Sequence, residues 1–95
     1  GVCPWMVPGG AAIAMATSEL MKHYHAAIWA QHGLFASGPD FDITFGLAHT
    51  IEKSAEIYIK VLSAGQGKIR QTITDDDLRA IAHDFGVTIN EKFLD

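Results

Sequence analysis

The chain has 95 residues, a formal net charge of −4 and 48% hydrophobic residues. A chain of this length is one domain at most. It has no cluster of lysine or arginine, which argues against a surface for nucleic acid or acidic membranes. Its single cysteine, Cys3, excludes an internal disulfide and fits a reducing compartment. No signal peptide is visible, and no uncharged apolar run approaches the roughly 18 residues of a membrane span.

The first half of the chain predicts one helix and one strand pair. Residues 1–9 are interrupted by two prolines and predict a segment without regular structure. Residues 11–24 have a helical composition, with apolar side chains at helical spacing. Residues 25–31 and 34–37 predict two short strands that meet at His32-Gly33.

The clearest predicted helix covers residues 41–64. Asp40 is a suitable N-cap, and two glycines, Gly65 and Gly67, end the helix. Apolar side chains at steps of three and four form one stripe along it, which we expect to pack on a central sheet. The stripe consists of Phe41, Phe45, Ala48, Ile51, Ala55, Tyr58 and Leu62.

A third helix is predicted to begin after Thr74 and to end at Gly86. Thr74 is a suitable cap, and three consecutive aspartates follow it. Such a run could suggest a cation site, but we interpret the aspartates as first-turn partners of the helix dipole. The predicted buried stripe consists of Leu78, Ile81, Ala82 and Phe85, and residues 87–95 form a short tail.

These elements do not complete a domain by themselves. A lone strand pair is only marginally stable in water, and the long apolar helix needs a sheet to lie on. We therefore predict an α/β architecture, with a mainly antiparallel central sheet covered by helices. Further strands would come from an N-terminal part that this chain does not contain.

His32 is the main candidate site residue. It stands at a predicted strand end and is followed by Gly33, which lets another group approach closely. A catalytic zinc site needs about three protein ligands and an open position, so one histidine is not sufficient. His32 is therefore either a structural histidine bonded to backbone or one ligand of a site completed elsewhere.

The other conspicuous side chains receive structural interpretations. Two histidines at i and i+2 could chelate a metal on a strand, but they fall where the first helix ends, so we interpret them as an exposed helix end. Two further histidines are expected on helix surfaces, and both tryptophans in packing contacts rather than in a substrate pocket. These residues are His23, His25, His49, His83, Trp5 and Trp29.

Short motifs along nearly the whole chain point to one family. They are Pro4-Trp5-Met6-Val7-Pro8-Gly9, His32-Gly33, Ser37-Gly38-Pro39, Thr44-Phe45-Gly46-Leu47, Glu52-Lys53-Ser54-Ala55-Glu56, Lys60-Val61, Gln71-Thr72-Ile73 and Phe85-Gly86-Val87-Thr88. Together they resemble the C-terminal part of rhamnulose-1-phosphate aldolases, a branch of the zinc-dependent class II aldolase, epimerase and adducin superfamily. The His-Gly pair indicates only the superfamily; the proline-rich motif and the Glu-Lys-Ser-Ala-Glu motif indicate the branch.

The resemblance implies a three-layer αβα fold, with residues 1–95 as the C-terminal part of a single class II aldolase domain. It implies cleavage of L-rhamnulose 1-phosphate to dihydroxyacetone phosphate and L-lactaldehyde. One zinc ion per subunit would stabilise the negative charge that develops on bond cleavage. A His-x-His pair and one later histidine hold the metal in this family, and His32 matches the later one. The acid–base residues would lie in the absent part, so no catalytic residue is assigned here and the fragment alone is expected to be inactive.

The resemblance also implies a cytoplasmic homotetramer that acts on a small sugar phosphate, with no nucleic-acid or membrane partner. Three alternatives stay open. The protein could be a fuculose-phosphate aldolase or a pentulose-5-phosphate 4-epimerase of the same superfamily. It could be a non-catalytic, adducin-like association domain. It could also be a free-standing small binding module.

Overall fold

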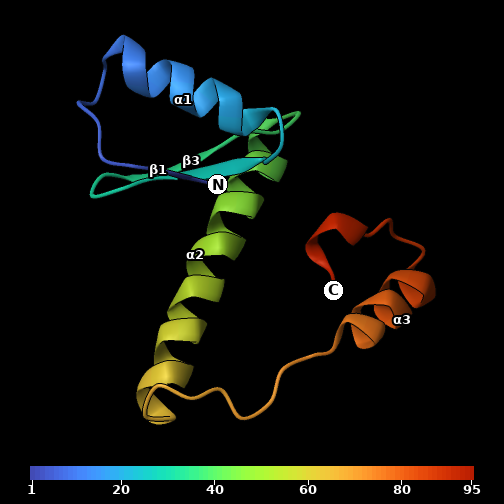
Figure 1. Cartoon of the computed structure of the whole chain (residues 1–95). Coiled ribbons are helices and arrows are strands. Elements are labelled where there is room, and N and C mark those ends of the chain that lie inside the picture. Colours follow the sequence, from blue (N-terminus) through green and yellow to red (C-terminus); the bar gives the residue numbers. More distant parts are fainter. The chain divides into compact units, whose positions relative to one another are not determined.

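The computed structural model describes residues 1–95 and divides into two compact units, Gly1–Ile59 and Lys60–Asp95. The long helix α2 begins in the first unit and ends in the second (Figure 1). In chain order the elements are β1 (Val2–Cys3), α1 (Ala11–Met21), β2 (Ala26–Trp29), β3 (Gly33–Ala36), α2 (Phe41–Ala64), α3 (Asp75–Phe85) and a 3-10 helix (Glu91–Phe93).

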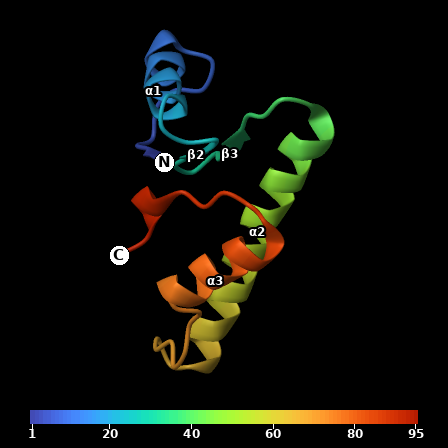
Figure 2. The same ribbon diagram turned by 90° about the vertical axis from the view of Figure 1, so that its right-hand side faces the viewer.

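The first unit is built on a three-stranded mixed sheet in the order β1-β2-β3. β1 runs parallel to β2, and β2 runs antiparallel to β3. α1 packs against β1 and β2, and both ribbon views show it on one side of the sheet (Figures 1 and 2). The small core between them contains Cys3, Ile13, Thr17 and Ala27, all buried. The arrangement is of the α/β class.

The strand prediction was incomplete. β1 was not predicted, because a two-residue strand carries no readable alternation and becomes regular only by pairing with β2. Since that pairing is parallel, the sheet is mixed, and a mainly antiparallel sheet is not confirmed. Two elements are shorter than expected: α1 ends at Met21 instead of residue 24, and β2 covers four residues instead of 25–31. β3 has the predicted four residues but begins one residue earlier, at Gly33.

The bounds predicted for α2 are confirmed. The Asp40 carboxylate accepts a hydrogen bond of 2.8 Å from the backbone N–H of Ile43, as an N-cap does. The predicted packing of its apolar stripe is wrong in this structure, because no side chain of α2 is buried and Phe41 is 94% exposed. The physical reason is that periodicity shows only which side of a helix is apolar, and in this chain the strands β1 and β2 pack against α1 and not against α2. No helix of the chain has the length and apolar character needed to cross a membrane.

The second unit is organised around α3. Thr74 and Asp77 form a reciprocal capping box at its start, and Gly86 ends it with a φ of +64°, a conformation that favours glycine. Both predicted ends are confirmed. Of the predicted stripe only Ala82 is buried, whereas Phe85 is 78% exposed, so that part of the prediction was wrong.

The tail is not structureless, because it forms the 3-10 helix and is tied to α3. The Arg79 guanidinium bonds the carboxylates of Glu91 and Asp76, each at 3.0 Å. These two partners raise the pKa of Arg79 above its ordinary value. The Asp75 carboxylate accepts from the backbone N–H of Asp95 at 2.7 Å.

Candidate functional site

A tight turn between β2 and β3 carries His32. Trp29 is the last residue of β2 and Gly33 the first of β3. The backbone N–H of His32 donates to the Trp29 carbonyl at 3.0 Å, which closes the turn. Gln31 inside the turn has a φ of +62°, in the left-handed region that residues other than glycine seldom adopt. The turn therefore fixes the backbone from which the His32 imidazole projects.

The His32 side chain is exposed and is free to accept a ligand. Its ring centroid lies 5.3 Å from that of Trp29, with the planes inclined at 57°. Within residues 1–95 neither ring nitrogen makes a hydrogen bond, so the structural alternative, a ring bonded to backbone, is not found. An accessible imidazole nitrogen on a defined turn is a suitable zinc ligand, and His32 fits that role as one member of a larger set.

The indole of Trp29 is anchored to α1. Its Nε1–H donates to the Thr17 hydroxyl at 2.9 Å, and that hydroxyl donates to the Ile13 carbonyl at 2.7 Å. The indole also stacks on Phe35, with centroids 5.9 Å apart and planes only 9° apart. Thr17 was not predicted as a site residue from the sequence. Its signal is a hydroxyl four residues after Ile13, on the face of a helix that must pack against a sheet.

His32 has no companion ligands in the described chain. No group of three or more histidine, cysteine, aspartate or glutamate side chains in residues 1–95 could hold a metal. His23 and His25 are exposed between α1 and β2, as expected. His49 stacks on Phe45 at 6.3 Å, and the exposed His83 contacts the carboxylate of Asp84 at 3.2 Å.

The remaining candidates also keep structural roles. The three aspartates of the first turn of α3 bond to the backbone of Asp95, to Arg79 and to Thr74, so none is left as part of a cation site. Cys3 is buried at 1% exposure, consistent with an inert thiol. Trp5 is 61% exposed, so its expected packing contact is not made within this chain.

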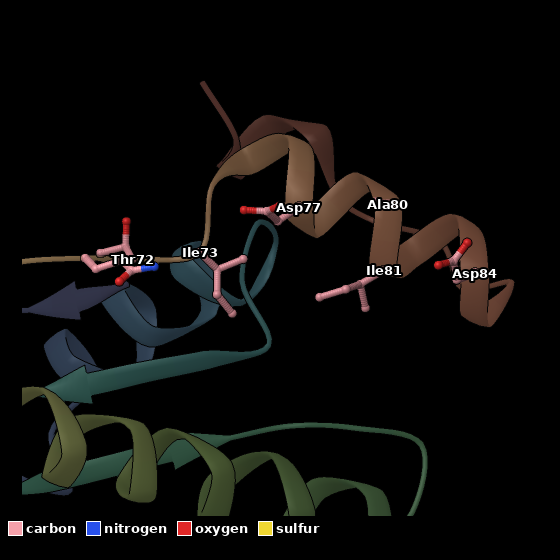
Figure 3. Close-up of a pocket in the computed structure, with 7 residues that line it drawn as sticks. Thr72, Ile73, Asp77, Ala80, Ile81 and Asp84 are labelled. Carbon is pink, nitrogen blue, oxygen red and sulfur yellow. The ribbon is translucent and has the colours of Figure 1, made fainter.

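Each of the two units contains a cavity. One, of about 370 Å³, lies in the first unit, and Ile13, Thr17, Trp29 and Phe35 are among the residues that line it. The other, of about 640 Å³, lies in the second unit, where Asp77, Ile81 and Asp84 of α3 line it together with Thr72 and Ile73 of the preceding segment (Figure 3). Neither lining contains a lysine, arginine or histidine.

The first unit of the chain matches a known protein family. Residues 1–59 match the family model described as the class II aldolase and adducin N-terminal domain. The chain belongs to the class II aldolase and adducin family. The match covers β1, α1, β2 and β3, and with them His32 and its tryptophan neighbour.

Curated members of the family resemble the chain over its whole length. It is 46% identical over 95 residues to a protein of Enterococcus faecalis and 48% identical over 95 residues to one of Klebsiella pneumoniae. It is 51% identical over 94 residues to one of Pectobacterium atrosepticum. All three are named rhamnulose-1-phosphate aldolase, and the matches cover 99–100% of this chain. The chain spans about a third of the length of these relatives, 33–34%.

Proposed function

We propose that this chain is part of a zinc-dependent class II aldolase that cleaves L-rhamnulose 1-phosphate to dihydroxyacetone phosphate and L-lactaldehyde. The observation that carries the proposal is the 46–51% identity, over essentially all of the chain, to proteins named rhamnulose-1-phosphate aldolase. The accessible imidazole of His32, on a turn inside the family match, supports it. A homotetrameric, cytoplasmic enzyme is the corresponding expectation.

In this proposal the chain contributes one metal ligand. When bound, zinc would supply Lewis-acid stabilisation of the negative charge that develops as the carbon–carbon bond breaks. His32 would hold the ion through a ring nitrogen, and the β2–β3 turn would fix the backbone of that ligand. The other ligands, the acid–base groups and the phosphate-binding groups would come from the rest of the polypeptide or from a neighbouring subunit.

The fold of the complete protein follows the same proposal. β1 and β3 are the edge strands of the sheet, and such edges readily pair with further strands. We propose that the three strands are one portion of a larger, mainly antiparallel sheet in a three-layer αβα domain. Residues 1–95 would then be the C-terminal part of that domain.

The test is a cleavage assay on the full-length polypeptide. L-Rhamnulose 1-phosphate is supplied, and release of dihydroxyacetone phosphate is measured before chelation, after chelation, and after zinc is restored. Loss and recovery of turnover would support the proposal. Faster turnover of L-fuculose 1-phosphate, or epimerisation of a pentulose 5-phosphate, would assign the chain to a sibling activity. A protein with neither zinc nor turnover would favour an association role.

A further inference from the structure

Thr17 of α1 is joined to Trp29, the last residue of β2, by a hydrogen bond that can run in only one direction. The Thr17 hydroxyl gives its only proton to the Ile13 carbonyl at 2.7 Å, so it offers only lone pairs to other groups. The indole Nε1 of Trp29 can only donate, and it does so to that oxygen at 2.9 Å. Thr17 is 6% exposed, so water does not readily replace either partner. The bond therefore sets the position of the indole relative to α1.

Trp29 in turn contacts His32 in two ways. Its carbonyl accepts the His32 backbone N–H at 3.0 Å, and its indole lies against the imidazole at a centroid distance of 5.3 Å. Phe35 stacks on the same indole, which limits rotation of the tryptophan. An imidazole that binds a divalent cation becomes more positive, and indole is the aromatic ring best suited to face positive charge.

We infer that Thr17 and Trp29 are positioning residues for His32. They hold its imidazole in one orientation, so that binding a metal does not first have to order a mobile side chain. The inference rests on the proposed function, because it assumes that His32 is the metal ligand. It goes further by assigning a role to an α1 hydroxyl that touches neither metal nor substrate. A metal ligand that must be ordered on binding lowers the affinity for the metal by about 2- to 10-fold for one side chain.

The experiment measures the zinc dissociation constant of the full-length protein by competition with a chromophoric chelator. Thr17→Val keeps the side-chain shape and removes the hydroxyl, whereas Trp29→Phe keeps an aromatic ring and removes the N–H. We expect each variant to bind zinc about 2- to 10-fold more weakly, because His32 must then be ordered when the metal binds. Thr17→Ser keeps the hydroxyl and should bind zinc like the wild type. Thr50→Val is the matched control, an exposed threonine on α2.

A second readout separates positioning from loss of stability. With cobalt(II) in place of zinc, the visible absorption bands report the ligand geometry. Altered bands in Thr17→Val and Trp29→Phe, recorded well below the unfolding temperature, are expected. If Thr17→Val does not fold, Trp29→Phe carries the test alone.

Wild-type affinity and unchanged bands in both variants, with zinc binding abolished in His32→Ala, would overturn the positioning role while leaving the proposed function intact. Wild-type zinc binding in His32→Ala would overturn the metal role of His32, and the positioning role with it.

Discussion

Thr74 and Asp77 exchange hydrogen bonds at the start of α3. The Asp77 backbone N–H donates to the Thr74 hydroxyl at 3.1 Å, and the Asp77 carboxylate accepts from the Thr74 hydroxyl at 2.6 Å and from its backbone N–H at 3.0 Å. The bond from the hydroxyl, followed by that from the backbone, lowers the pKa of Asp77 below its ordinary value of 3.8. The cap is therefore sensitive to acid.

The first prediction concerns this sensitivity. Because the pKa of Asp77 is lower in the folded chain, its stabilising contribution is complete above pH 3.8 and is lost as the pH falls through the lowered value. Asp77→Asn should lower helix stability at pH 7, and its difference from the wild type should shrink below about pH 4. Thermal unfolding monitored by circular dichroism from pH 7 to pH 2 checks this. Asp84→Asn at the other end of α3 is the control, and a difference that stays constant with pH would contradict the prediction.

The second prediction contrasts two glycines of α2 and its C-terminal turn. A Cβ added at Gly65 would lie 2.1 Å from the Lys68 carbonyl oxygen, whereas one added at Gly46 would meet nothing within 4 Å. Gly65→Ala should therefore destabilise the turn by about 1–3 kcal/mol. Gly46→Ala should stabilise the helix by about 1 kcal/mol, because alanine loses less backbone entropy there. Unfolding in urea gives both free energies of unfolding. If the two substitutions changed this free energy in the same direction, the space around each glycine would not explain their effects.

The third prediction concerns Gln31, whose φ of +62° lies in the left-handed region. Gln31→Val should destabilise the hairpin by about 1–2 kcal/mol, because a β-branched side chain is disfavoured there. Gln31→Gly should be nearly neutral, since glycine adopts this conformation freely. Comparison of the two unfolding temperatures checks the expectation, and equal temperatures would argue against strain in the turn.

The fourth prediction follows from the exposed position of His32. In the full-length protein, His32→Ala should remove most zinc binding and aldol cleavage while leaving the fold intact, because the side chain is not part of the core. Bound zinc is measured by atomic absorption, and the fold by near-ultraviolet circular dichroism. His49→Ala, on the exposed surface of α2, is the matched control. Unchanged zinc content in His32→Ala would exclude this residue as a ligand.

Local signals in the sequence were sufficient for the helices. Asp40, Thr74 and Gly86 act on backbone groups within four residues of themselves, so the start of α2 and both ends of α3 could be predicted. β1 could not, because its only regular structure is a pairing with Ile28 and Trp29 far along the chain. The exposure of the α2 stripe could not be predicted either, since periodicity indicates which side of a helix is apolar but not whether a partner covers it.

The candidate site was predictable only where local sequence signals define it. His32 could be placed at a strand end from the flanking apolar runs and Gly33. The bond between Thr17 and Trp29 joins residues twelve positions apart across two elements, and no spacing rule relates them. A buried tryptophan needs an acceptor for its N–H, and that requirement becomes specific only when the packing of α1 on the sheet is known.

The two strand pairings of the first unit differ greatly in sequence separation. β2 and β3 are joined by a turn of three residues, whereas the partners Val2 and Ile28 are separated by the whole of α1. Hairpins form in about 1–10 μs, and pairings between distant segments close more slowly. The turn that carries His32 therefore belongs to the part of the sheet that can form first. Substitutions in β1 should slow completion of the sheet and leave the geometry of that turn unchanged.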